Sequence, residues 1–104
     1  MKNKLHYSRL ALNDLEEIQN YILADSCSLY IAENEINNIL DAVQKLETFS
    51  EIGIMLDELV PFKSDYRILS VKKYLIFYRI EENDVYVDRI LHSRRNYIRI
   101  LFGR

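Results

Sequence analysis

The sequence predicts an α+β fold in which a two-helix antiparallel hairpin packs on one face of a small, mainly antiparallel sheet. Two amphipathic stretches with helical spacing occupy the first half of the 104 residues, and a short polar break separates them. Three segments rich in Val, Ile, Leu and Tyr follow, with polar turns between them. We therefore expect the order β-α-α-β-β-β and a short C-terminal helix, in a single domain spanning residues 1–104.

The N-terminal half is predicted to form one strand and both helices. Residues 4–7 favour a short strand that ends at Ser8, a good helix N-cap. Residues 9–24 have apolar side chains at helical spacing, and we place Asp14 among the polar residues of the outer face. After the polar break, which supplies a second N-cap, residues 29–49 repeat the pattern. So short a connection predicts an antiparallel hairpin.

The C-terminal half is predicted to form a loop, a three-stranded antiparallel meander and the terminal helix. Residues 50–64 contain Gly53 and Pro61 and show no clear period, so we expect a loop there. The predicted strands span residues 66–71, 74–80 and 85–91, and the predicted helix spans residues 96–102 with Ile98, Leu101 and Phe102 facing inward.

The first turn of the meander decides which face of the sheet carries Arg67. A two-residue turn at Lys72 and Lys73 places Arg67 opposite Tyr78, whereas one additional loop residue moves Arg67 to the other face. Two lysines are poor hairpin residues, so both registers remain open. The second turn contains an Asn-Asp pair, which suits left-handed or side-chain-bonded conformations.

Charge is divided unevenly along the chain. Residues 1–62 carry 4 basic and 11 acidic side chains, a net charge of -7, whereas residues 63–104 carry 10 basic and 5 acidic ones, a net charge of +5. Such a division is typical of a protein with one surface that meets an anion, either nucleic acid or an acidic protein. The alternative is that the two halves neutralise each other across the fold.

Composition points to a cytoplasmic protein that needs no membrane, metal or cofactor. No apolar run has the length of a membrane span, and the N-terminus lacks the apolar core of a secretory signal. The lone Cys27 has no partner for a disulfide within the chain, which fits a reducing compartment. No group of His, Cys and carboxylate residues has the spacing of metal ligands.

The last predicted strand leads into a cluster of basic and proton-transferring residues: His92, Arg94, Arg95 and Tyr97. Cations hold the charge of a phosphate, and an imidazole or a phenol can move a proton. In RNA cleavage through the 2′-hydroxyl, His92 would be base or acid, Arg67 would join the charge-stabilising arginines, and Tyr97 would orient or donate. For each residue a structural role, or a contact with a protein partner, is the alternative.

Four tyrosines of the meander raise a similar choice. Tyr66, Tyr74, Tyr78 and Tyr86 could stack nucleobases as an RNA platform. Tyrosines at strand spacing are more often half-buried packing residues, and we favour that interpretation.

Three runs of the sequence together resemble toxins of the RelE/ParE superfamily from bacterial type II toxin-antitoxin modules. They read HYSRLALNDLEEI at residues 6–18, DYRILSVKKYLIFYRI at residues 65–80 and VYVDRILHSRRNYIRILF at residues 85–102. Each run alone is degenerate, but their order and spacing are fairly specific. The resemblance covers essentially the whole chain, and it implies the same fold that the periodicity predicts.

The resemblance implies two possible activities, because RelE-like members cleave messenger RNA on the ribosome and ParE-like members poison DNA gyrase. The RNase branch typically has an arginine where this chain has Leu75. Arg95 does match the basic residue after the last strand. We therefore expect a growth-inhibiting, ParE-like toxin that binds gyrase. One alternative is a metal-independent endoribonuclease with His92, Arg95, Tyr97 and Arg67 as its catalytic set, and another is a non-toxic binding domain or decayed toxin.

The same resemblance implies the partners. Toxins of this superfamily are neutralised by a small cognate antitoxin whose flexible segment wraps the toxin, and operator DNA is bound only through the antitoxin complex. The target is DNA gyrase, or the ribosome with its mRNA. A basic, aromatic-lined sheet would attract an acidic amphipathic helix or an added strand. The candidate residues for contact with the target or the antitoxin are Arg79, Arg89, Arg94, Arg95 and Arg99.

Overall fold

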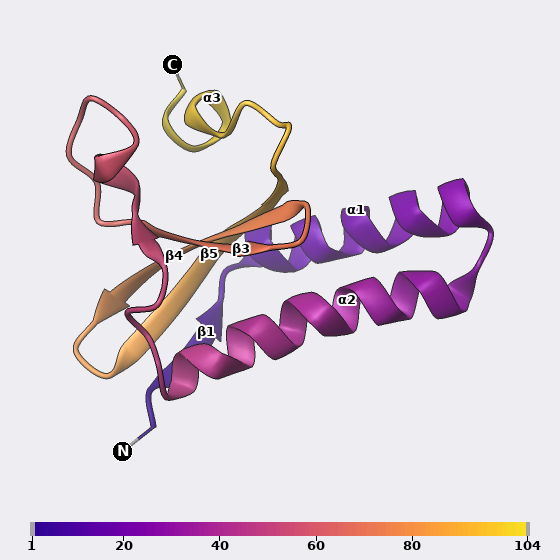
Figure 1. The fold of residues 1–104 in the computed structure, drawn as a ribbon, viewed down its shortest axis with the longest axis horizontal. Helices are drawn as coiled ribbons and strands as arrows, with labels where there is room; N and C mark the ends of the chain where they lie inside the picture. Colours follow the sequence, from indigo (N-terminus) through magenta and orange to yellow (C-terminus); the bar gives the residue numbers. More distant parts are fainter. Residues whose placement is uncertain (1, 104) are drawn as a thin grey trace.

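A five-stranded mixed sheet carries the helical hairpin on one face and the short terminal helix on the other (Figure 1). The structure is a computed structural model, and it describes residues 2–103. The elements are β1 (Lys4–Tyr7), α1 (Arg9–Ser26), α2 (Leu29–Gln44), the 3-10 turn η1 (Lys45–Glu47), β2 (Ile54–Met55), the 3-10 turn η2 (Leu56–Glu58), β3 (Arg67–Val71), β4 (Tyr74–Glu81), β5 (Asp84–His92) and α3 (Tyr97–Phe102).

The strands lie in the order β1-β5-β4-β3-β2. The β1 strand runs parallel to β5, whereas the other neighbouring pairs are antiparallel. The first strand of the chain therefore lies beside the last one, and α1 begins two residues beyond β1, at the edge of β5. This arrangement confirms the predicted α+β class and its mainly antiparallel sheet.

The helical hairpin forms because side chains cap both of its helices. The Ser8 hydroxyl accepts a hydrogen bond from the Ala11 amide at 2.9 Å, and the Ser28 hydroxyl accepts one from the Ile31 amide at 3.2 Å. Cys27 adopts a left-handed conformation with φ of 55° at the end of α1. Both predicted caps are thus confirmed. Neither helix, nor any other helix within residues 2–103, has the length and apolarity required to cross a membrane.

The main core lies between the hairpin and the sheet. Ala11 of α1 and Ile39 of α2 pack on Ile76 and Tyr78 of β4 and on Val87 of β5, and all five are fully buried. A second, smaller cluster covers the opposite face, with α3 and the segment after β2 packed on it. The inward-facing residues predicted for the terminal helix, Ile98, Leu101 and Phe102, pack there.

The predicted loop at residues 50–64 is wrong in part, because it contains β2, which pairs with β3. A two-residue strand is too short to show a period. The segment that leads into β2 is held on the sheet by the buried hydroxyl of Tyr78. This hydroxyl accepts a hydrogen bond from the Gly53 amide at 2.9 Å and donates one to the Ser50 carbonyl at 2.7 Å. A β-carbon on Gly53 would lie 2.6 Å from the Tyr78 hydroxyl oxygen, so the chain needs glycine there.

The first turn of the meander has two residues, so Arg67 lies opposite Tyr78. Lys72 adopts a positive φ of 54° to close this turn. In the second turn the left-handed residue is Glu82, with φ of 55°, instead of the Asn or Asp that the sequence favours. The sheet register therefore overrides local preference at both turns.

The placement of Asp14 on the solvated face is also wrong, because its side chain is only 5% exposed. Its carboxylate accepts two hydrogen bonds from the Arg89 guanidinium, at 2.8 and 2.9 Å, and a third from the Ile90 amide at 2.9 Å. The pairing of β1 with β5 ends at Val87. Asp14 therefore binds the edge of β5 just beyond the point where its strand partner stops.

We predict that Asp14→Ala lowers the free energy of unfolding by about 3–5 kcal/mol, because it leaves the Arg89 guanidinium and a buried amide without their partner. Urea denaturation followed by circular dichroism measures the loss. The matched control is Glu16→Ala on the exposed face of the same helix, which should change the free energy by no more than about 0.5 kcal/mol. Equal stability of the two variants would contradict the structural role of Asp14.

Candidate functional site

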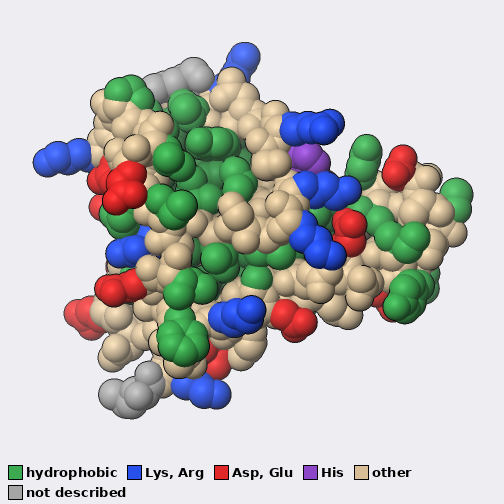
Figure 2. Space-filling model, viewed as in Figure 1, with side chains coloured by type: hydrophobic (Ala, Val, Ile, Leu, Met, Phe, Trp, Pro, Cys, Tyr) green, Lys and Arg blue, Asp and Glu red, His purple; other side chains and the backbone are tan. Residues whose placement is uncertain are grey.

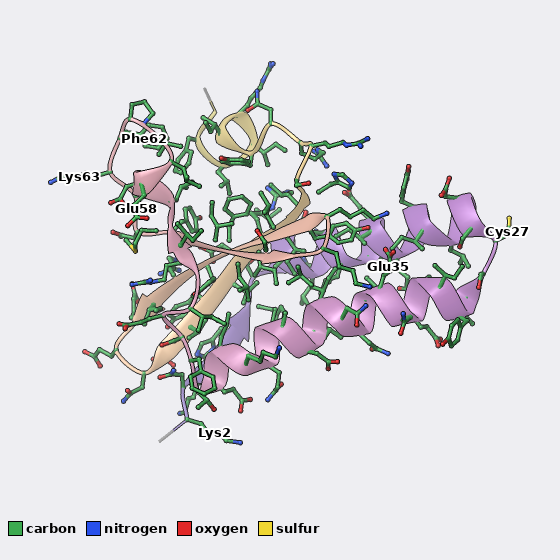
Figure 3. The ribbon with its side chains drawn as sticks, viewed as in Figure 1. Lys2, Cys27, Glu35, Glu58, Phe62 and Lys63 are labelled. Carbon is green, nitrogen blue, oxygen red and sulfur yellow. The ribbon has the colours of Figure 1, made fainter. Side chains whose placement is uncertain are left out.

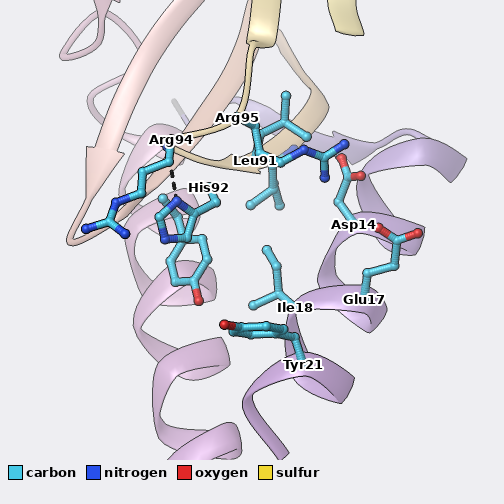
Figure 4. A pocket seen from close by; sticks show the side chains of 10 residues that line it. Asp14, Glu17, Ile18, Tyr21, Leu91, His92, Arg94 and Arg95 are labelled. Carbon is cyan, nitrogen blue, oxygen red and sulfur yellow. Dashed lines mark hydrogen bonds between the residues drawn. The ribbon is translucent and has the colours of Figure 1, made fainter. Parts of the chain in front are cut away.

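A groove of about 420 Å³ lies between α1 and the end of β5 (Figure 4). This volume is within the range of ligand and peptide side-chain pockets. One wall is formed by β4, β5 and the turn after β5. This wall contains three of the site residues predicted from the sequence, His92, Arg94 and Arg95. The lining consists of Asp14, Glu17, Ile18, Tyr21, Tyr74, Ile90, Leu91, His92, Arg94 and Arg95.

The wall formed by α1 is one face of that helix. Asp14, Glu17, Ile18 and Tyr21 are spaced at i, i+3, i+4 and i+7, which places their side chains in one row. Sequence reasoning missed this wall because it treated the acidic residues of α1 as solvated. The spacing of Asp14 to Ile18 within the apolar stripe was the signal that could have identified it.

The opposite wall is held by hydrogen bonds of the turn that follows β5. The His92 ring nitrogen Nδ1 accepts a hydrogen bond from the Arg94 amide at 3.0 Å, drawn as the dashed line in Figure 4. The Arg95 amide donates to the His92 carbonyl at 2.9 Å, and the Ser93 amide donates to the Lys73 carbonyl at 2.8 Å. These bonds fix the backbone from which Arg94 and Arg95 project.

The hydrogen bond to Nδ1 determines what the neutral His92 ring offers to the groove. A nitrogen that accepts from an amide carries no proton, so the neutral ring is protonated at Nε2. Nε2 is then a hydrogen-bond donor, and the lone pair that a general base needs is already engaged. In this geometry His92 is suited to binding an acceptor such as a carboxylate or a carbonyl.

Tyr74 supplies a buried phenol to the groove, with 4% of its surface exposed. Its hydroxyl donates to the Glu35 carboxylate at 3.4 Å, and its ring meets the His92 ring edge to face at 5.6 Å. Burial, with a further contribution from Glu35, raises the pKa of Tyr74 to about 12. Tyr74 therefore stays neutral at physiological pH and acts as a packing residue.

Two of the residues expected for RNA cleavage lie outside the groove. The Tyr97 ring packs on Phe77 at 5.2 Å, in the cluster on the other face of the sheet. Arg67 donates to the carbonyls of Glu51 and Gly53, at 3.3 and 3.1 Å. Arg67 pairs with Tyr78 of β4, whereas His92 pairs with Tyr74 of the same strand. Tyr78 and Tyr74 are four positions apart, which is roughly 13 Å along the strand. Neither side chain belongs to the set that His92 and Arg95 form.

The arginines expected to contact a partner fall into two groups. Arg89 is bound to Asp14, and this hydrogen bond raises the pKa of Arg89. Arg79 donates to Asp88 at 3.0 Å and to Glu81 at 3.1 Å. In contrast, Arg94, Arg95 and Arg99 are exposed and have no ion pair among residues 2–103.

The tyrosines of the meander are packing residues in this fold. Tyr74 and Tyr78 are buried in the main core. The Tyr86 ring stacks against the His6 ring at 4.8 Å and lies 4.5 Å from the guanidinium of Arg79. The rings of Tyr74, Tyr78 and Tyr86 are therefore covered by protein, and the Tyr66 ring contacts Phe77 and Phe102 edge to face at 6.4 and 6.1 Å.

The groove combines an apolar floor with a cationic rim. Figure 2 shows several Lys and Arg side chains around a histidine, where the hairpin leaves the body of the molecule. Within residues 2–103 no group of three or more His, Cys, Asp or Glu side chains is placed to share a metal ion. The guanidinium groups of Arg94 and Arg95 are donors at this rim, which therefore suits an anionic or acceptor-rich partner.

Comparison with known proteins identifies the family. The sequence model described as "ParE toxin of type II toxin-antitoxin system, parDE" matches residues 5–97. The chain belongs to this ParE toxin family. It is thus the toxin component of a type II toxin-antitoxin system, in which an antitoxin is the partner, and the resemblance predicted from the sequence is confirmed.

A solved structure from the "Chromosomal ParDE TA system from P. aeruginosa" has the same fold. Its TM-score is 0.73 at 18% identity, and the match covers 89% of this chain and 98% of that chain. The backbones of the two chains therefore have the same fold over nearly their whole length, although few residues are identical. A search of the curated proteins found no match.

We predict that Tyr74 of this ParE-family toxin ionises well above the usual range of tyrosine. Because the pKa of Tyr74 is higher in the folded chain than its usual value of 10.0, its contribution to stability is complete below pH 10 and is lost as the pH rises towards 12. The ultraviolet titration of the wild type minus that of Tyr74→Phe should have its midpoint near pH 12. A midpoint near 10 would show that the phenol is solvated.

Proposed function

We propose that this toxin arrests growth by binding DNA gyrase, without catalysing a reaction, and that its cognate antitoxin neutralises it. The observation that carries the proposal is the dispersal of the acid-base residues. Cleavage through a 2′-hydroxyl needs a base, a charge-stabilising group and an acid around one phosphate. His92 and Arg95 share a groove, whereas Tyr97 and Arg67 lie in two other places.

Family membership supports the same proposal. The matching family is that of ParE, and the RelE-type arginine is replaced by Leu75, which packs against the second cluster. The hydrogen bond from the Arg94 amide to Nδ1 of His92 further supports binding, since it occupies a lone pair through which the ring would act as a base. A contact surface requires none of these groups to transfer a proton.

We infer that the groove is the antitoxin contact. Its apolar floor, with Ile18, Tyr21 and Leu91, suits the apolar face of an amphipathic segment. Its rim, with Arg94 and Arg95, suits the acidic residues of that segment. Arg99, also exposed, extends the cationic surface along α3. Operator DNA would then be bound by the antitoxin part of the complex.

The test is induced expression of the toxin without its antitoxin, followed by parallel assays of gyrase supercoiling and of mRNA cleavage on ribosomes. We predict growth arrest, inhibited supercoiling and intact mRNA. His92→Ala should keep full toxicity, because the ring positions the turn and transfers no proton. Cleaved mRNA, together with loss of toxicity in His92→Ala, would replace the proposal with the endoribonuclease. An absence of growth arrest would identify a non-toxic binding domain.

The antitoxin assignment is tested in the same system with Arg94→Ala/Arg95→Ala. This variant should lose antitoxin binding by at least about tenfold, or about 1.4 kcal/mol, because it removes both rim charges that would pair with acidic residues of the antitoxin. The matched control is Lys72→Ala/Lys73→Ala in the neighbouring turn, which should leave the affinity within about twofold. Equal losses in both variants would mean that total charge, and not the groove, sets the affinity.

A further inference from the structure

The outer half of the helical hairpin projects beyond the sheet. The last α1 residue that packs on the main core is Ile18, and the first from α2 is Ile39. Between them, within residues 19–38, only Ile22 and Ala32 are buried. Figure 1 shows both helices extending past the strands, and Figure 3 places Cys27 at the outer end.

This outer half exposes large apolar side chains that the fold does not use. Leu29, Tyr30 and Ile31 are 56%, 78% and 44% exposed. Figure 2 shows hydrophobic side chains gathered at the end of the projecting hairpin. Clustered apolar side chains of this kind mark contact surfaces, and tyrosine is enriched among residues that dominate binding. We call the set Leu23, Leu29, Tyr30 and Ile31 the tip surface.

The tip surface lies on a strongly acidic hairpin. Residues 10–44 contain 7 Asp and Glu and no Lys or Arg. Asp14 is paired with Arg89, but the exposed Glu16, Asp25 and Glu33 have no ion pair among residues 2–103. The hairpin therefore has the opposite charge to the groove rim, and the two surfaces suit different partners.

The tip is also held in one conformation before any partner arrives. The Ser26 hydroxyl donates to the Ile22 carbonyl at 2.7 Å and accepts from the Ser28 amide at 3.2 Å. The Cys27 amide donates to the Leu23 carbonyl at 2.9 Å. A surface that is already ordered loses little conformational entropy on binding, which favours a rigid docking site.

We propose that the tip surface is where this toxin docks on a basic, DNA-binding face of gyrase, an inference that rests on the proposed function. An enzyme that binds DNA presents Lys and Arg to the phosphates, so its DNA-binding face carries positive charge, opposite to the negative charge of the hairpin. The apolar tip then supplies the contact area, and the surrounding carboxylates supply attraction and orientation. The antitoxin at the groove and gyrase at the tip occupy separate surfaces of the toxin.

The test compares purified toxin variants in gyrase supercoiling. Leu29→Ser/Tyr30→Ser should raise the toxin concentration for half-inhibition by about tenfold or more, as expected for residues at the centre of a contact. The matched control is Phe49→Ser/Leu59→Ser, which removes apolar side chains of similar exposure, 61% and 58%, away from the hairpin. The control should inhibit like the wild type, and both variants should bind the antitoxin and unfold like the wild type.

A second pair of variants isolates charge without changing shape. Asp25→Asn/Glu33→Gln should inhibit less at low salt and depend less on salt than the wild type. Asp57→Asn/Glu58→Gln removes the same charge from the exposed loop after β2 and should behave like the wild type. Equal effects of the two pairs would overturn the assignment of the hairpin.

The remaining outcomes separate this inference from the proposed function. If the wild-type toxin does not inhibit gyrase, both the proposed function and this inference are wrong. If it inhibits and Leu29→Ser/Tyr30→Ser inhibits equally well, the inference alone falls. If that variant loses antitoxin binding, or shifts from dimer to monomer in sedimentation, while still inhibiting gyrase, the tip surface belongs to the antitoxin or to a second copy, and the inference is likewise overturned.

Discussion

The ion pair between Asp14 and Arg89 is the interaction on which the rest of this fold depends. The hairpin must be attached to the sheet at the point where β1 ends and β5 continues alone. A buried carboxylate would be costly there without full compensation. Asp14 obtains it from two guanidinium hydrogen bonds and the Ile90 amide, while the Ser8 hydroxyl, six residues earlier, donates to the neighbouring Asp88 carbonyl at 2.7 Å. Two polar side chains of α1 and its cap thus replace the missing end of β1.

This attachment also creates the groove. Because Asp14 fixes α1 against Ile90, the next turn of the helix, with Ile18 and Tyr21, faces the end of β5 across a space that apolar side chains leave unfilled. The turn after β5 then places Arg94 and Arg95 at the rim. The proposed function uses this arrangement as a contact for another protein, because the groove holds its side chains in fixed positions.

The elements that the sequence predicts correctly are those determined by neighbours along the chain. The caps Ser8 and Ser28, the apolar stripes of the helices and the three meander strands are local features. What it misses depends on distant residues: β2 is fixed by the Gly53 contact with Tyr78, and Asp14 is buried by an arginine 75 positions away. The two walls of the candidate site differ in the same way. The β5 wall was predicted, because its residues are neighbours in the sequence. The α1 wall was missed, because its position depends on the ion pair between Asp14 and Arg89. The separation of Tyr97 from His92 was likewise not predictable, because it depends on the face of the sheet on which α3 packs.

Amide hydrogen exchange at Ile90 tests the account most directly, because this amide lies beyond β1 and its partner is the Asp14 side chain. In the wild type, Ile90 should be protected to a degree similar to Val85 and Val87 in the same strand. In Asp14→Ala, compared under conditions that keep the variant folded, Ile90 should lose far more protection than those two neighbours. An Ile90 amide that exchanges freely in the wild type, or keeps its protection in the variant, would contradict the claim that Asp14 completes the edge of β5.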